Sequence, residues 1–209
     1  TDAPKEPVPM AEELDFLFRE AQQSLGVSLS RADVLSVWVG LRPLVVQGAA
    51  DAAGGSTSTM SREHLIQREA PGFVTVTGGK WTTYRSMAEE VLHTLQAHGD
   101  LAPAPNGPVD TRQHRLVGAP APGDSTPQHP LSDAPGLHLW GSQAHRVWAL
   151  PGADHALGLG LTEAMVRYAA RHEWAFTVED MLARRWRALF LDARQAASMA
   201  PQVAALLQE

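Results

Sequence analysis

After an acidic, proline-rich stretch at residues 1–9, apolar residues recur at intervals of three and four. That spacing places them on one face of an α-helix. The apolar positions are Leu14, Leu17, Phe18 and Ala21. Glu12 and Glu13 fall in the first turn, where negative charge suits the helix dipole, and Gly26 supplies a stop. We therefore predict an amphipathic helix over residues 10–25, followed by at most a short capped turn at residues 30–33.

Three runs are predicted to be strands. Residues 34–39 and residues 73–77 are rich in β-branched and aromatic residues, and a further strand begins at residues 61–66. Pro71 and Gly72 lie between the second and third runs, as in a tight turn. We therefore predict that the second and third strands form an antiparallel pair.

Helical periodicity returns after Lys80 and dominates the last third of the chain. Within residues 84–95, one helix face is apolar, and the helix ends before Gly99; the residues on this face are Tyr84, Ala88, Val91, Leu92 and Leu95. Thr162 and the capping-box pattern of residues 177–180 predict two further helix starts. Residues 99–136, which lie between the first of these helices and the other two, are rich in Pro, Gly, Ala and Asp, which is typical of a linker. From residue 137 on, we expect helices alone. The predicted fold class is α+β, with domains at 1–98 and 137–209 joined by the linker at 99–136.

Composition limits the function classes. The 209 residues carry a net charge of −6, which argues against a general nucleic-acid binder. The absence of cysteine excludes disulfides, thiolate metal sites and a cysteine nucleophile, and the scattered histidines lack ligand spacing, so no metal site is predicted. No apolar stretch approaches the length of a spanning helix, so we expect a soluble or peripheral protein. The chain starts without Met, which suggests a piece of a longer protein.

The densest candidate chemistry is a strand-to-helix turn that contains Gly78, Gly79 and Lys80. Glycines allow a ligand close to the backbone, and free N–H groups at a helix start favour an anion. A phosphate-binding P-loop would need Gly at position 74 and Ser or Thr at 81, where this chain has Val and Trp. An ordinary tight turn with an exposed lysine is the alternative.

Arg42 and Arg62 each lie beside a predicted strand end, as Lys80 does. Converging guanidinium groups and one ammonium would suit a phosphate or a carboxylate. The alternative is that each arginine forms a surface ion pair. A further basic cluster on a predicted helix contains Arg184, Arg185 and Arg187; we interpret it as interdomain ion pairs, with anionic lipid as the alternative.

Several stretches together resemble one known family. They resemble the C-terminal portion of FAD-dependent, respiratory glycerol-3-phosphate dehydrogenase. Residues 163–185 resemble the helical C-terminal domain of that family, and the turn at Gly78, Gly79 and Lys80 resembles its glycine–lysine turn. The remaining stretches that carry the resemblance are Ser36-Val-Trp-Val-Gly-Leu-Arg-Pro-Leu44, Ser61-Arg-Glu-His64 and Gly78-Gly-Lys-Trp-Thr-Thr-Tyr-Arg-Ser-Met-Ala-Glu89. The resemblance implies that the first domain is an incomplete remnant of a flavin and substrate domain, and that the second is a helical bundle.

The resemblance also implies roles for individual residues. Arg42 and Arg62 would bind the phosphate of glycerol 3-phosphate, and Lys80 would act at the reacting hydroxyl. The implied flavin-binding residues are Gly40, Leu41, Gly78, Gly79, Lys80, Trp81, Thr82 and Thr83. The product would be dihydroxyacetone phosphate, with electrons passed to quinone at the inner-membrane surface by a cytoplasmic, peripheral enzyme. The resemblance is also compatible with a homo-oligomer, in which a second copy of the chain would be the partner.

One departure from the family is large: its dinucleotide-binding half has no counterpart in this sequence. We therefore expect this chain alone to be inactive and not to retain FAD. Two alternatives stay open. One is a fragment of a glycerol-3-phosphate oxidase, which would use oxygen as electron acceptor. The other is a non-catalytic helical module that acts in docking or membrane association.

Overall fold

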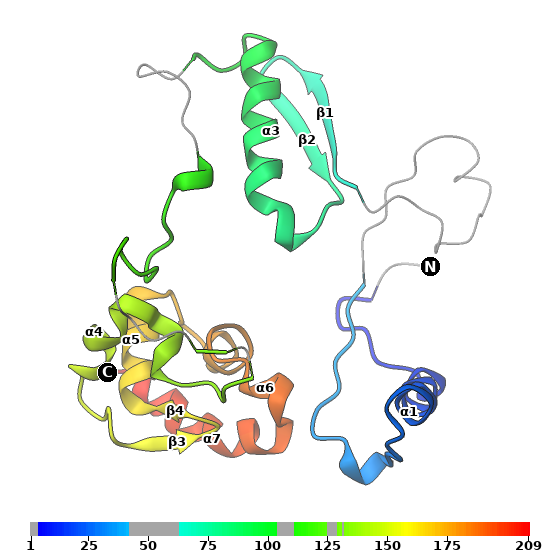
Figure 1. Ribbon diagram of the computed structural model, residues 1–209, viewed down its shortest axis with the longest axis vertical. Helices are drawn as coiled ribbons and strands as arrows, with labels where there is room; N and C mark the ends of the chain where they lie inside the picture. The colour runs from blue at the N-terminus through cyan, green and yellow to red at the C-terminus, as the bar shows by residue number, and fades with distance from the viewer. Residues whose placement is uncertain (1–3, 42–62, 104–110, 125–128, 131) are drawn as a thin grey trace. The chain divides into compact units, whose positions relative to one another are not determined.

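The computed structural model describes residues 4–41, 63–103, 111–124, 129–130 and 132–209 (Figure 1). The chain forms two compact units. One contains Thr1–Gly40 together with Arg115–Glu209, and the other contains Leu41–His114.

The first unit begins with helix α1, Ala11–Leu25, which confirms the predicted amphipathic helix. Gly26 ends it in the left-handed conformation at φ 68°, the usual role of a glycine after a helix. A short 3₁₀ turn, Arg31–Asp33, follows as predicted, and Arg31 pairs with Asp15 of α1 at 3.0 Å. No residue of α1 is buried, so its apolar stripe is without a tightly packed partner among the described residues.

The strand predicted at residues 34–39 is wrong for this structure. The segment is extended, but the described part of the chain offers no strand beside it, and a β-strand forms only by pairing. Its contacts are instead with helices near the C-terminus. Leu35 accepts a hydrogen bond from the Ala193 N–H at 3.1 Å, and the Trp38 ring meets the Phe190 ring edge-on at 5.0 Å.

The C-terminal part of the first unit contains all the residues that are buried in the described structure, and they form one core between Val147 and Leu206. The elements around this core are the 3₁₀ helix Leu137–Gln143, α4 Ala144–Trp148, β3 Ala156–Gly158, β4 Leu161–Thr162, α5 Glu163–His172, the π-helical turn Asp180–Arg185, α6 Ala188–Leu191 and α7 Ala193–Leu206 (Figure 1). Helix α7 contains Pro201 without interruption.

The β3–β4 hairpin corrects the expectation that residue 137 onward is entirely helical. Its two-residue turn places Leu159 at φ 49° and Gly160 at φ 76°. Two successive positive φ values are typical of the two-residue turns that match the twist of a hairpin. Such turns favour Asn, Asp or Gly at the first position, so Leu159 does not predict one from the sequence. The Trp186 indole N–H donates to the Leu159 carbonyl at 2.9 Å, and this holds the turn onto the core.

The predicted helix starts in this domain are confirmed. The Thr162 hydroxyl accepts a hydrogen bond from the Met165 N–H at the start of α5. The Asp180 carboxylate accepts from the Thr177 N–H at 3.1 Å, and the Thr177 hydroxyl accepts from the Asp180 N–H at 3.0 Å. Phe176 lies beyond the end of α5 and is 70% exposed.

The second unit is a hairpin followed by a helix. Strands β1, Leu65–Ala70, and β2, Phe73–Thr77, pair antiparallel across the predicted turn, and helix α3 covers Tyr84–Ala97 (Figure 1). Arg68 of β1 donates to Asp100 beyond α3 at 2.5 and 2.9 Å, and these hydrogen bonds lower the pKa of the Asp100 carboxyl. None of the described residues of this unit is buried.

The predicted α+β fold class is confirmed, with two small antiparallel sheets among the described residues and a helical C-terminal domain. The predicted domain boundaries stay a prediction. Among the helices that the structure describes, none has both the length and the apolar character needed to cross a membrane.

Candidate functional site

The predicted strand-to-helix turn is present in the second unit. Strand β2 ends at Thr77, and Gly78 and Gly79 follow with φ values of 76° and 87°. Lys80 is extended, and the 3₁₀ turn Trp81–Thr83 leads directly into α3. Two successive left-handed residues turn the chain sharply enough to bring Lys80 back to the start of the helix.

Gly79 is required by its backbone conformation, and the space beside it is also narrow. A Cβ at this position would lie 2.5 Å from Met87 Cε and 2.6 Å from Met87 Sδ, and 3.2 Å from His64 Cβ. A side chain would therefore displace the end of the Met87 side chain and press on His64. The glycine lets the turn lie close against these two residues.

The turn has free hydrogen-bond donors. Within the described chain, the backbone N–H groups of Gly79, Lys80 and Trp81 donate to no other group, and the Lys80 ammonium has no partner. The Lys80 carbonyl is occupied, because it accepts from the Thr83 N–H at 3.0 Å and from the Thr83 hydroxyl at 3.1 Å. Unused N–H groups beside an unpaired ammonium are what an electron-rich group requires.

A concavity of about 380 Å³ opens beside this turn. Its described lining consists of Glu63, His64, Gly79, Lys80, Thr83, Ser86 and Glu90. The His64 Nε2 atom lies 2.7 Å from the Glu90 carboxylate, so the imidazole is held in one orientation. The lining therefore combines one lysine and one histidine with two carboxylates, and its described residues alone are not a purely cationic site.

The structure brings together Gly79, Lys80 and Thr83 of the predicted site residues. Trp81 is 85% exposed and stacks on Tyr84 with ring centroids 5.1 Å apart, outside the concavity. Thr82 is also exposed and outside the lining.

Two other predicted site residues lie elsewhere. Gly40 and Leu41 belong to different units and do not line the concavity. Arg42 and Arg62 lie outside the described residues, so the predicted convergence of three cations stays a prediction.

Sequence reasoning missed Glu63, His64, Ser86 and Glu90 as lining residues. Thr83, Ser86 and Glu90 recur at intervals of three and four, so helical periodicity alone places them on the face of α3 that follows the glycine turn. His64 gives no comparable signal, because only the register of β1 against β2, with Leu65 opposite Thr77, carries it to the turn.

The basic cluster near the C-terminus pairs within its own domain. Arg184 contacts Glu179 at 2.6 Å and Asp180 at 3.0 Å, while Arg185 donates to the carbonyl of Glu173 at 2.6 Å. The interpretation of Arg184 and Arg185 as interdomain ion pairs is therefore wrong. Their function is to hold the π-helical turn and the loop before it.

Comparison with known proteins agrees with the resemblance that the motifs suggested. Residues 109–209 match the family model described as the C-terminal domain of alpha-glycerophosphate oxidase. Three mitochondrial glycerol-3-phosphate dehydrogenases are similar along nearly the whole chain. That of Arabidopsis thaliana is 34% identical over 96% of this chain and 35% of its own length. That of Bos taurus is 32% identical over 99% of this chain and 30% of its own length. That of Schizosaccharomyces pombe is 31% identical over 100% of this chain and 38% of its own length.

The chain thus spans about a third of the length of the curated relatives it matches. The similarity includes the hairpin, the glycine–lysine turn and the helical domain, because it extends over both units. This chain belongs to the glycerol-3-phosphate dehydrogenase family and corresponds to a C-terminal portion of such a protein.

Proposed function

We propose that this chain is the C-terminal portion of an FAD-dependent enzyme that oxidises sn-glycerol 3-phosphate to dihydroxyacetone phosphate. The observation that carries the proposal is the similarity to glycerol-3-phosphate dehydrogenases over 96–100% of the chain, which includes the Lys80 turn. Because the relatives are about three times longer, the activity requires the portion of the enzyme outside the match.

Lys80 is the residue that we assign to the reacting end of the substrate. Its ammonium is unpaired among the described residues and lines the concavity. A compact cation of this kind stabilises the negative charge that develops when the substrate hydroxyl loses its proton. We assign the phosphate group of the substrate to Arg42 and Arg62, since guanidinium groups bind phosphate through two parallel hydrogen bonds.

The residues at the turn fit a flavin edge. FAD would supply the acceptor for the hydride from the substrate carbon. The unused N–H groups of Gly79, Lys80 and Trp81 would hold the electron-rich edge of the ring system, and the absence of a Cβ at Gly78 and Gly79 permits its close approach. The proposed flavin contacts of Gly40, Leu41, Thr82 and Thr83 complete this set.

The first test is spectroscopic and uses the chain by itself. Purified as 209 residues, it should show no visible flavin absorbance and no turnover of glycerol 3-phosphate, because most of the relatives' length is absent. A stoichiometric flavin spectrum would refute this part of the proposal.

The second test uses the chain joined to the rest of the enzyme in one active polypeptide. Lys80→Gln should lower kcat/KM for glycerol 3-phosphate by on the order of 10²–10³-fold, the usual loss when one preorganised charge-stabilising group is removed. Lys5→Gln is the matched control, since Lys5 is the only other lysine in the chain. A Lys80→Gln enzyme within threefold of the unmodified one would remove Lys80 from the site.

A glycerol-3-phosphate oxidase is the second candidate, favoured by the match of residues 109–209 to the C-terminal domain of alpha-glycerophosphate oxidase. The two enzymes differ in electron acceptor. Oxygen consumption with peroxide release would identify the oxidase, and reduction of a quinone analogue without peroxide would identify the dehydrogenase.

We further propose that the complete enzyme is cytoplasmic, binds at the inner-membrane surface as a peripheral protein, and passes its electrons to quinone there. The helical domain is the candidate for the docking role, because it has the only buried core in the described structure. Pelleting with anionic liposomes, compared with neutral ones, tests this. Recovery of the chain in the supernatant of both would refute membrane docking by this portion.

A further inference from the structure

The concavity beside Lys80 contains charges of both signs. The Lys80 ammonium forms no ion pair within the described chain, although the Glu63 and Glu90 carboxylates line the same space of about 380 Å³. An ammonium and a carboxylate in one small concavity attract each other, and more strongly than in open water. The free state of Lys80 therefore depends on what the neighbouring carboxylates bind instead.

His64 binds the Glu90 carboxylate. The imidazole Nε2 atom lies 2.7 Å from Glu90 Oε2. A carboxylate can only accept hydrogen bonds, so Nε2 carries the proton and His64 is the donor. The His64 side chain is 23% exposed and that of Glu90 is 58% exposed, so the imidazole is the more enclosed member of the pair. Without this hydrogen bond, the more exposed carboxylate could turn toward Lys80.

The hairpin and the glycine turn together set the position of His64. His64 directly precedes β1, in which Leu65 lies opposite Thr77 at the end of β2. Its Cβ lies 3.2 Å from the position that a Cβ of Gly79 would take, so the histidine lies against the turn. Glu90 belongs to α3. The hydrogen bond therefore joins the strand side of the concavity to its helix side.

An oxyanion at this site would meet both favourable and unfavourable groups. The Lys80 ammonium, the unused N–H group of Gly79 and the Ser86 hydroxyl, which has no partner within the described residues, are donors. The Glu90 carboxylate would repel the same anion, and if it paired with Lys80 it would occupy the cation itself. A donor bound to Glu90 reduces both penalties, and His64 is that donor.

We propose that His64 is a positioning residue of the Lys80 concavity: it binds Glu90, keeps that carboxylate off the Lys80 ammonium, and leaves the ammonium free for a small oxyanion. The inference deepens the proposed function and rests on it for the identity of that anion in the complete enzyme, glycerol 3-phosphate. The competition itself involves only residues of one unit. It can therefore be measured on the 209-residue chain with inorganic phosphate as the probe.

Titration of the ¹⁵N-labelled chain with inorganic phosphate, followed through the amide chemical shifts of Gly79, Lys80 and Trp81, measures the affinity. His64→Phe keeps a planar ring but removes the N–H that Glu90 accepts. We expect the phosphate Kd to rise at least about threefold at low ionic strength, the effect of one exposed ion pair between Glu90 and Lys80. The difference should shrink as salt is added, because salt screens exposed charges.

Removal of the competing carboxylate should reverse the effect of His64→Phe. In the double variant His64→Phe/Glu90→Gln, Kd should return to within about twofold of Glu90→Gln alone, since the cycle isolates the coupling between the two side chains. Glu90→Gln should itself bind phosphate at least as tightly as the unmodified chain. A histidine that only supports the hairpin would give no such rescue, because Glu90→Gln restores no packing. A double variant as weak as His64→Phe would overturn the proposal.

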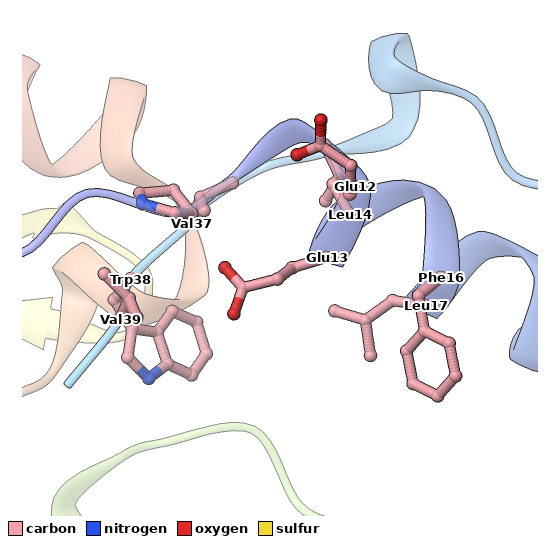
Figure 2. Close-up of a pocket in the computed structure, with 9 residues that line it drawn as sticks. Glu12, Glu13, Leu14, Phe16, Leu17, Val37, Trp38 and Val39 are labelled. Carbon is pink, nitrogen blue, oxygen red and sulfur yellow. The ribbon is translucent and has the colours of Figure 1, made fainter. Parts of the chain in front are cut away.

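Two control variants make the same chemical changes outside the concavity. His93→Phe replaces an exposed histidine of α3 that does not line it. Glu12→Gln removes a carboxylate from α1 in the other unit, where Glu12 borders a mainly apolar groove of about 490 Å³ (Figure 2). Both should leave the phosphate affinity unchanged. If Glu12→Gln altered it as much as Glu90→Gln, the effect would belong to net charge and the proposal would be wrong.

The remaining outcomes separate this inference from the proposed function. If neither the unmodified chain nor Glu90→Gln shows phosphate-dependent shifts at the turn, the inference is overturned. If His64→Phe unfolds the hairpin, Glu90→Gln decides by itself, and weaker phosphate binding in that variant would refute the competition. Rescue in the double variant, combined with full activity of the Lys80→Gln enzyme, would support the inference while the proposed role of Lys80 in turnover failed.

Discussion

Replacing Gly160 with alanine should destabilise the helical domain strongly. Gly160 is at φ 76° in the β3–β4 turn, and a Cβ there would overlap with the backbone carbonyl oxygen of Pro135. Pro135 is part of the chain that leads into the first helix of the domain, and a backbone oxygen cannot rotate away as a flexible side chain would. The Trp186 ring, 3.4 Å from the same Cβ position, blocks movement of the turn in the other direction.

The expected cost has two parts. Forcing alanine into the left-handed region costs about 1–2 kcal/mol, and displacing close-packed neighbours costs a further ~1–3 kcal/mol. The sum of about 2–5 kcal/mol is a large fraction of the stability of a small domain. At roughly 4–8 °C per kcal/mol for a domain of this size, Tm should fall by at least about 8 °C.

Thermal unfolding followed by near-ultraviolet circular dichroism measures this change, because four of the six tryptophans lie in the helical domain. The matched control is Gly123→Ala. Gly123 is at φ 83°, but no atom lies within 4 Å of its Cβ position. Alanine at this position should therefore cost only the free energy of the left-handed backbone conformation. If the two variants unfold within about 2 °C of each other, the close approach of the hairpin to Pro135 is not a feature of the folded domain.

Substitutions at three other positions test separate interactions. Trp186→Phe keeps an aromatic ring in the core but leaves the Leu159 carbonyl without its donor, which should cost about 1–3 kcal/mol in urea unfolding. Thr162→Ala removes the cap of α5 and should cost about 0.5–2 kcal/mol, while Thr162→Ser should cost less. Hydrogen bonds from Arg68 lower the pKa of Asp100, so this pair stabilises the second unit above the ordinary carboxyl pKa of 3.8 and loses its effect as the pH falls through the lowered value. In Asp100→Asn, the melting temperature measured by circular dichroism should therefore fall less between pH 5 and pH 2 than it does in the unmodified chain.

Elements encoded by neighbouring residues could be predicted from the sequence. The Thr177 and Asp180 side chains cap their own helix three residues apart, and Gly26 ends α1 directly after its last turn. Pro71 and Gly72 close the β1–β2 hairpin in the same local way. In each case the partner groups are within a few residues, so the sequence contains the whole interaction.

Elements that depend on distant partners could not be predicted. Residues 34–39 have the composition of a strand, but pairing needs a second strand, which the described chain does not contain. The β3–β4 turn forms at Leu159 because the Trp186 indole, 27 residues away, binds its carbonyl. At the candidate site, periodicity could place Ser86 and Glu90, whereas His64 arrives only through strand register.

The distribution of burial explains why the candidate site and the stable core are in different parts of the chain. The helical domain has a complete core that includes Leu161, Met181 and Met199, each at most 1% exposed. The unit that contains Lys80 has no buried residue in its described part, although its glycine turn is already shaped by the contact with Met87. A site needs rigid surroundings to hold its groups against a substrate. The role proposed for the Lys80 turn therefore requires packing that the described part of its own unit does not provide.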